Sequence, residues 1–128
     1  MLNIDEGMPL TESGAWEIFD GSKFLIAHTT NLKFQRELAR LQQPHRKKIE
    51  AGTMDPKLSK ELVCRAMSTG LLLDWANVVN GQKESVPFSI EAAFKVLMNN
   101  TAFREFVSEF SSNLENFRQQ EVEEVGKV

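Results

Sequence analysis

The pattern of hydrophobic and polar residues near the N-terminus predicts a β-hairpin over residues 15–27. Two short segments rich in aromatic and aliphatic side chains flank Asp20-Gly21. This dipeptide favours a two-residue type I′ turn because both central residues of that turn need positive φ. In the resulting register Trp16 lies opposite Leu25. Two isolated strands are only marginally stable in water, so we expect the hairpin to pack against helices.

Further along the chain, apolar residues recur every three or four positions, which is the spacing of helices with one buried face. Each predicted helix begins at a residue whose side chain can cap the first turn, or at a proline that fits the first helical position. We expect helices after Asn31, after Asp55-Pro56 as far as Trp75, after Ser89, and from Ala102 to Glu124. The segment around Leu73 is assigned to the second of these helices.

These elements predict a mainly α fold of about four to five helices with one short N-terminal β-hairpin. The 128 residues leave room for a single domain. Within it we expect an N-terminal arm at 1–14, a helical domain at 15–118, and an acidic, frayed tail at 119–128.

Composition narrows the class of protein. Nine Phe and two Trp with no Tyr indicate that aromatic area is used for packing and apolar docking. The net charge of −3 lacks the basic excess of a nucleic-acid module, and the single cysteine, Cys64, cannot form an internal disulfide. The acidic N-terminus is unlike a signal peptide, and the stretch 71–73 is too short to cross a bilayer. We expect a cytoplasmic protein with no membrane partner.

No catalytic motif is recognisable in the sequence. The seven glycines do not have the spacing of a phosphate loop, and neither His28 nor His45 lies in a metal-binding motif. Cys64 is expected to be a small buried hydrophobe. An enzyme would need Asp74, Glu84 and a histidine to meet in one pocket. We therefore expect no enzymatic activity, cofactor or metal.

Charge is distributed unevenly along the chain. Residues 23–48 carry seven bases and one acid, and residues 105–124 carry six acids and one base. Two interpretations are open. The basic segment could hold a phosphate backbone, or it could be a solvated face that pairs with the acidic C-terminal helix of the same or a neighbouring copy. The residues that could drive such self-association are Lys33, Arg36, Arg40, Arg46, Lys47, Lys48, Glu121, Glu123 and Glu124.

A stripe of phenylalanines follows the last predicted helix. Phe103, Phe106 and Phe110 have the spacing of a face turned toward the core. Phe117 adjoins the acidic end, where contacts with the core should thin out, so we expect it to be exposed and to meet a partner. The predicted partner-binding residues are Phe19, Phe88, Phe110, Leu114, Phe117 and Val122.

The order of several segments resembles the tail assembly chaperones of long-tailed, siphovirus-like bacteriophages. The resemblance spans roughly residues 14–118, and it depends on packing and capping residues rather than on a catalytic signature. The segments are Trp16 with Phe24-Leu25-Ile26-Ala27, Asn31-Leu32-Lys33-Phe34-Gln35-Arg36-Glu37-Leu38, Leu72-Leu73-Asp74-Trp75-Ala76-Asn77-Val78, Pro87-Phe88-Ser89 and Leu114-Glu115-Asn116-Phe117-Arg118.

This resemblance implies a small, mainly helical, non-catalytic protein of the host cytoplasm that is absent from the mature virion. Its implied partner is the phage tape measure protein, which such chaperones keep soluble while the major tail protein polymerises around it. Many members also have a frameshifted longer form, and a homo-oligomer is expected. The alternative is a small helical regulator or packaging factor that binds nucleic acid through residues 33–48. Nucleic-acid binding should weaken steeply with salt, whereas apolar client binding should survive it.

Overall fold

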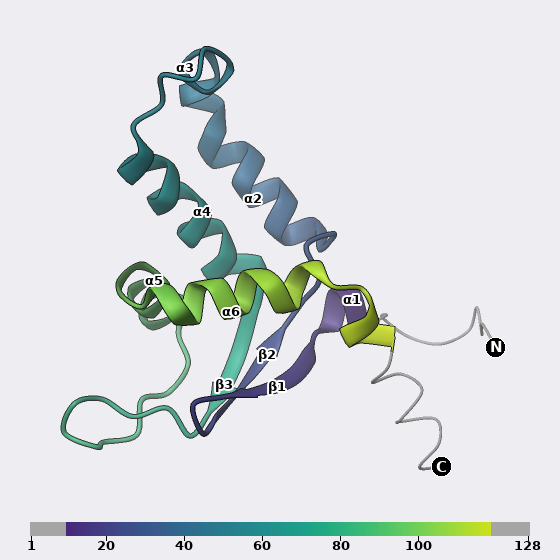
Figure 1. Cartoon of the computed structure of the whole chain (residues 1–128), viewed down its shortest axis with the longest axis vertical. Coiled ribbons are helices and arrows are strands. Elements are labelled where there is room, and N and C mark those ends of the chain that lie inside the picture. Colours follow the sequence, from purple (N-terminus) through teal and green to yellow (C-terminus); the bar gives the residue numbers. More distant parts are fainter. Residues whose placement is uncertain (1–9, 119–128) are drawn as a thin grey trace.

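A three-stranded antiparallel sheet lies under a layer of helices, and a helical arm projects from it (Figure 1). The computed structural model describes residues 10–118. The elements in chain order are α1 (Leu10–Ser13), β1 (Ala15–Phe19), β2 (Ser22–Ile26), α2 (Leu32–Gln42), a 3₁₀ turn η1 (Gln43–His45), α3 (Arg46–Glu50), α4 (Pro56–Gly70), β3 (Leu72–Ala76), α5 (Ile90–Asn99) and α6 (Thr101–Ser112).

The predicted hairpin is confirmed. Strands β1 and β2 pair in the expected register, with Trp16 opposite Leu25. Asp20 and Gly21 both have positive φ, at 50° and 80°, as a type I′ turn requires. Because the strand side chains alternate between faces, Phe24 points into the core and Lys23 points to the opposite face of the sheet.

The mainly α prediction is wrong, because the segment assigned to the end of a long helix forms strand β3. Helix α4 ends at Gly70, and Leu72–Ala76 pairs antiparallel with β2, placing Trp75 opposite Phe24. The fold is therefore mixed α and β. A third strand gives the hairpin the partner that two strands lack. A short apolar run such as 71–73 suits either a helix or a strand, so tertiary pairing decides its structure.

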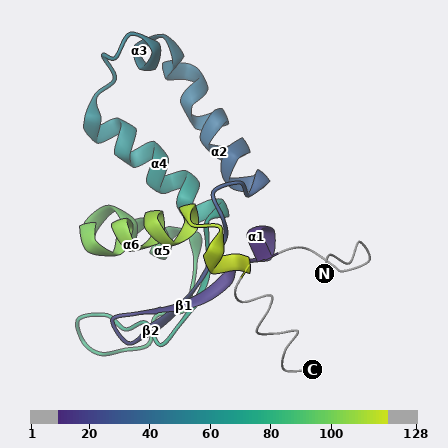
Figure 2. The same cartoon turned by 45° about the vertical axis from the view of Figure 1, so that its right-hand side comes forward.

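Helices α2 and α4 form an antiparallel pair that we call the arm, with η1 and α3 at its tip (Figures 1 and 2). Its predicted caps are confirmed: the Asn31 side chain accepts the Phe34 N–H, and the Asp55 side chain accepts the Lys57 N–H. The backbone of α2 lies close to that of α4 at Gly70. A Cβ placed there would lie 2.4 Å from the Phe34 nitrogen, so the crossing requires glycine.

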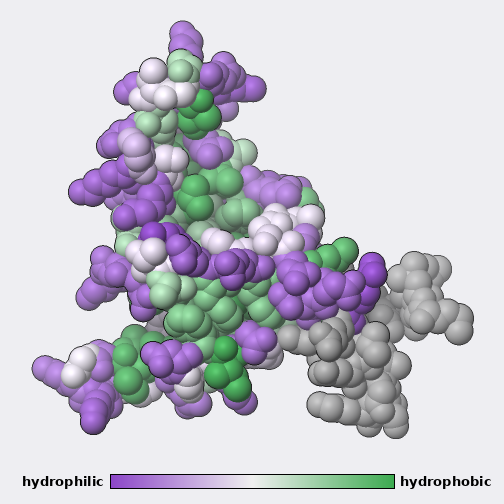
Figure 3. All heavy atoms as spheres, viewed as in Figure 1, coloured by the Kyte–Doolittle hydropathy of each residue, from purple (hydrophilic) through white to green (hydrophobic). Residues whose placement is uncertain are grey.

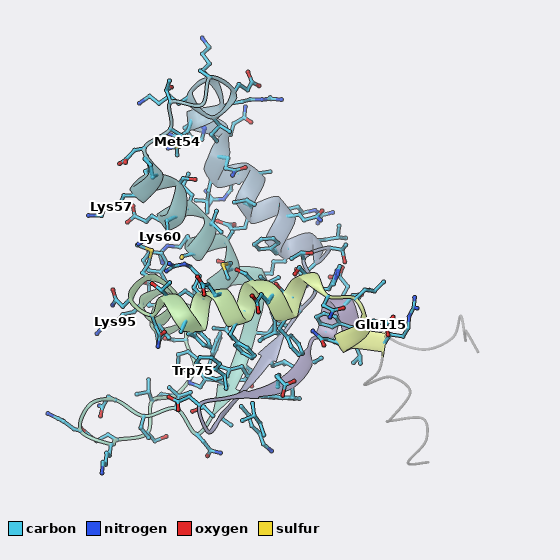
Figure 4. All side chains as sticks on the ribbon, viewed as in Figure 1. Met54, Lys57, Lys60, Trp75, Lys95 and Glu115 are labelled. Atoms are coloured by element: carbon cyan, nitrogen blue, oxygen red, sulfur yellow. The ribbon has the colours of Figure 1, made fainter. Side chains whose placement is uncertain are left out.

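The core lies between the sheet and helices α4, α5 and α6. Its centre is aromatic: the Phe24 ring lies 4.7 Å from Phe103 and meets Trp75 edge-on at 6.3 Å. Trp75, labelled in Figure 4 beneath α6, also donates its indole N–H to the Val86 carbonyl at 2.8 Å. This hydrogen bond connects the loop between β3 and α5 to strand β3. Ser89 then caps α5 as predicted, by accepting the Ala92 N–H.

The prediction of one helix from 102 to 124 is wrong, because α6 ends at Ser112. Asn113 leaves the helical conformation and accepts the Glu115 N–H on its side-chain oxygen, and a new helical turn occupies 115–118. Asn116 donates from its side chain to the Phe110 carbonyl. The chain thus turns back toward the core before residue 118.

The expected exposure of Phe117 is wrong for the same reason. The turn at Asn113 directs this ring inward, and its side chain is 1% exposed. Phe117 packs edge-on against Phe110, with centroids 5.7 Å apart, and against His28 at 5.3 Å. Contacts with the core therefore continue to the end of the described chain.

Part of the N-terminal segment 1–14, which is distinct from the α2–α4 arm, forms a helix. Residues 10–13 form α1, and its Thr11 carbonyl accepts the His28 N–H at 3.0 Å. Asn31, while capping α2, also donates to the Glu12 carbonyl. The segment 1–9 lies outside the described residues, as does the predicted tail 119–128.

Candidate functional site

Cys64 and His28, two residues with reactive side chains, lie in the interior of the protein. Cys64 has no solvent exposure, and burial raises the pKa of its thiol. His28 is also buried, and the Thr30 N–H donates to its Nδ1 at 3.2 Å. The same nitrogen lies 2.8 Å from the Thr30 hydroxyl oxygen. Both side chains are held by packing rather than presented to solvent.

The other residues that were considered for catalysis lie on different elements of the fold. His45 lies at the tip of the arm, Asp74 on β3, and Glu84 in the loop before α5. The Asp74 carboxylate accepts the backbone N–H of Trp75 at 2.8 Å. Within residues 10–118 no group of three or more His, Cys, Asp or Glu side chains could hold a metal ion. In the same part of the chain, no helix has the length and hydropathy to cross a membrane.

The predicted partner-binding residues occupy different environments. Phe19 is half-buried and stacks on Phe106 at 4.7 Å, and Phe88 is half-buried against Trp75 at 5.2 Å. Phe110 is buried like Phe117. Leu114 is exposed, and Val122 lies outside the described residues. These residues do not form one surface, and their role in partner binding stays a prediction.

The predicted basic residues gather on the arm. Residues 32–60 carry eight bases and three acids, a net charge of +5 in a chain of net charge −3. All eight bases are exposed: Lys33, Arg36, Arg40, Arg46, Lys47, Lys48, Lys57 and Lys60. In Figure 4, Lys57 and Lys60 lie along the side of the arm opposite to α2. The acidic residues Glu121, Glu123 and Glu124, their predicted counterparts, lie outside the described residues.

Two of these bases have ion-pair partners within the arm. Arg40 pairs with Glu37, and its hydrogen bond holds the pKa of that carboxyl below the usual value. Arg46 pairs with Glu50 at 3.4 Å. Both side chains of the Arg46–Glu50 pair are exposed, and in the Arg40–Glu37 pair the arginine is exposed. Such surface ion pairs contribute little to stability. Lys33, Arg36, Lys47 and Lys48 have no ion-pair partner among residues 10–118.

Between its charged edges the arm carries an apolar stripe that the core does not cover. The core reaches Phe34 on α2 and Val63 on α4, and α2 has no fully buried residue. Beyond this point, half-buried leucines line the two helices, and we call them the leucine seam: Leu38, Leu41, Leu58 and Leu62. In both ribbon views no other described element lies against this half of the arm (Figures 1 and 2). Figure 3 shows hydrophobic side chains exposed along the arm between polar edges.

A second surface was not predicted from the sequence: a groove between strand β1 and helix α6. Its volume is about 310 Å³, and we call it the β1–α6 groove. Phe106 and Phe110 contribute the aromatic side chains of its lining, and Glu17 and Glu109 contribute the carboxylates. The Glu17 carboxylate accepts the Ile18 N–H at 2.8 Å. Only the packing of α6 on the sheet brings these residues together, although the alternation from Trp16 to Phe19 indicated a strand with one polar position.

The face of the sheet opposite the helices also exposes apolar side chains. Ile18 and Trp16 are 60% and 44% exposed. With Glu17, Lys23 and Ala76 they line a concave surface of about 500 Å³. Among the surfaces that the described chain presents to solvent, the leucine seam and this sheet face are mainly apolar, whereas the β1–α6 groove combines aromatic and carboxylate side chains.

These features define a small α and β protein whose distinctive surfaces are an arm and two concave faces. The chain belongs to the YdaY prophage protein family, which it matches over residues 29–127, and it is therefore phage-derived. The matched region begins just before α2, and thus includes the whole arm, β3, α5 and α6 but neither strand of the hairpin. No curated protein and no solved structure matches the chain.

Proposed function

We propose that this prophage protein is a tail assembly chaperone that binds the phage tape measure protein through the arm. The leucine seam carries the proposal, because it is an amphipathic two-helix surface that the protein's own core leaves half-open. A client helix with an apolar face could pack along the seam and complete a three-helix bundle. Because binding stabilises the soluble form by mass action, the chaperone would need no nucleotide.

Two further features of the proposal come from the resemblance to phage tail chaperones. The protein would act in the host cytoplasm and be absent from the mature virion. A frameshifted longer form would recruit the major tail protein for polymerisation around the tape measure. Mass spectrometry of induced cells tests the second feature, because a longer form would give peptides that join this sequence to a second reading frame.

The direct test is co-expression with the tape measure protein of the same prophage. We expect the wild-type chain to increase the soluble fraction of the client and to elute with it in size exclusion. The double variant Leu38→Gln/Leu62→Gln should lose both effects, since it places amides in the seam. Glu61→Gln, an exposed change on the same helix, is the matched control and should behave as wild type.

A thermal melt of each variant distinguishes a variant that has lost only its binding surface from one that no longer folds. If the wild-type chain leaves client solubility unchanged and forms no complex, the chaperone proposal is wrong. The same conclusion follows if the folded seam variant still binds as well as the wild type.

The charge of the arm favours one other candidate, a regulator or packaging factor that binds nucleic acid. Eight exposed bases on a projecting element could follow a phosphate backbone. Affinity for duplex DNA should then fall steeply between about 50 and 200 mM salt. Arg36→Glu/Arg40→Glu should abolish that binding while leaving client binding by the seam intact. Nucleic-acid affinity that survives this double charge reversal would eliminate the alternative.

A further inference from the structure

The β1–α6 groove has the chemistry of a receptor for a basic side chain beside an apolar one. Its floor includes Phe106, which is half-buried, and the exposed Ile18 lies at its strand side. Glu17 and Glu109 contribute negative charge from opposite walls, and neither has an ion-pair partner among residues 10–118. The Glu17 carboxylate accepts one hydrogen bond, from the Ile18 N–H at 2.8 Å. A volume of about 310 Å³ accommodates one or two long side chains.

The tip of the arm has the complementary chemistry. Lys47 and Lys48 are exposed on α3 and lack ion-pair partners within the described chain. The next residue, Ile49, is 39% exposed. The tip therefore presents two free ammonium groups beside an exposed aliphatic side chain. Such a combination matches a groove with carboxylate walls and an apolar floor.

A tip cannot reach the groove of its own chain. Helix α3 lies at one end of the molecule and strand β1 at the other, with the length of the arm between them (Figure 1). We propose that Lys47, Lys48 and Ile49 of one copy dock into the β1–α6 groove of a second copy. The contact joins two different surfaces, so every open oligomer keeps one free tip at one end and one free groove at the other. The association is therefore head-to-tail and extends to chains or rings.

This inference goes beyond the proposed chaperone role and does not depend on any client. The leucines of the seam belong neither to the tip nor to the β1–α6 groove, so the head-to-tail contact does not use them. Because the contact combines exposed charges with a small apolar area, it should be weak and sensitive to salt. We expect reversible oligomers at low salt that dissociate at about 0.5 M NaCl.

A reciprocal charge reversal on the full-length chain tests the contact. The first variant, Lys47→Glu/Lys48→Glu, has an acidic tip and an unchanged groove. The second, Glu17→Lys/Glu109→Lys, has a basic groove and an unchanged tip. Each variant alone places like charges together, so its self-association should weaken at least about tenfold in sedimentation velocity. An equimolar mixture restores both complementary contacts, and should form alternating oligomers of wild-type size.

Lys57→Glu/Lys60→Glu is the matched control, because it reverses two exposed charges on the arm away from the tip. It should associate as the wild type does, and all variants should keep the wild-type melting temperature. Three outcomes would overturn the proposal: a wild-type chain that is monomeric at every concentration, variants that still self-associate, or a mixture that stays monomeric. Equal weakening by the control variant would also overturn it, since charge alone rather than this contact would then be responsible.

Discussion

Gly70 shows how one residue without a side chain sets the position of an element. It lies at the last turn of α4, where a methyl group would overlap the backbone of α2 at Phe34 and Lys33. Gly70→Ala gains helix propensity of about 1 kcal/mol, but it must separate the two helices of the arm at their crossing. We expect a net loss of about 1–3 kcal/mol in the free energy of unfolding, the usual cost of overpacking.

Urea denaturation measures this loss. Gly81→Ala is the control, because a Cβ at Gly81 meets no atom within 4 Å. That change should alter the free energy of unfolding by less than about 0.5 kcal/mol. A Gly70→Ala protein as stable as the wild type would mean that the arm helices are not in close contact at this point.

Phe117 provides a second prediction for a single residue, because the structure buries a ring that was expected to be exposed. Phe117→Ala removes a ring that is 1% exposed and packs on Phe110 and His28. We expect the free energy of unfolding to fall by about 3–5 kcal/mol. Leu114→Ala, at a position 46% exposed, should cost less than about 1 kcal/mol. Thermal or urea unfolding distinguishes the two, and a small effect at Phe117 would favour the original view of a partner-facing ring.

The elements that could be predicted from the sequence are those fixed by local interactions. Asp20-Gly21 determines its turn, and Asn31 and Ser89 each accept a hydrogen bond from a residue three positions away. Strand β3 could not be found in this way, because its structure depends on the free edge of β2, far away in the sequence. The turn at Asn113 was likewise missed, since the Phe stripe continues past it with helical spacing. The β1–α6 groove depends on the packing of α6 against β1, which are far apart in the sequence, and no local pattern indicated it.

Two of the confirmed caps, Asn31 and Ser89, differ in the other hydrogen bonds that they make, which yields a prediction at the level of elements. Ser89→Ala removes one cap of α5 and should cost about 1 kcal/mol. Asn31→Ala removes the cap of α2 and also the hydrogen bond to the Glu12 carbonyl of α1, at a site only 5% exposed. We expect it to cost about 2–3 kcal/mol, because a partly buried acceptor loses its partner as well.

Limited proteolysis separates these two contributions of Asn31. Cleavage near α1 should become faster in Asn31→Ala and stay unchanged in Ser89→Ala, once both are compared at equal global stability. Equal costs for the two substitutions, with no change in cleavage near α1, would show that the Glu12 contact contributes nothing.

At the scale of the whole molecule, the structure combines a well-packed body with an arm that its own core only half supports. Buried aromatic contacts join the sheet to α6, whereas the arm beyond Phe34 and Val63 is held by the packing of α2 against α4. Segments with few buried contacts open with low free energy. We therefore expect amide hydrogen exchange to be slow in β2 and α6 and clearly faster in the outer arm, residues 36–60, in the monomer at high salt.

The same measurement locates both proposed contacts in one molecule. Addition of a client helix should slow exchange along the arm beside the leucine seam and leave β1 unchanged. Head-to-tail association, induced by lowering the salt without a client, should slow exchange at α3 and at Ile18, whose N–H lies at the groove. Because the two proposals protect different segments, each can fail alone. Uniform exchange through arm and body would contradict the division into a stable body and an open arm, on which the use of the seam depends.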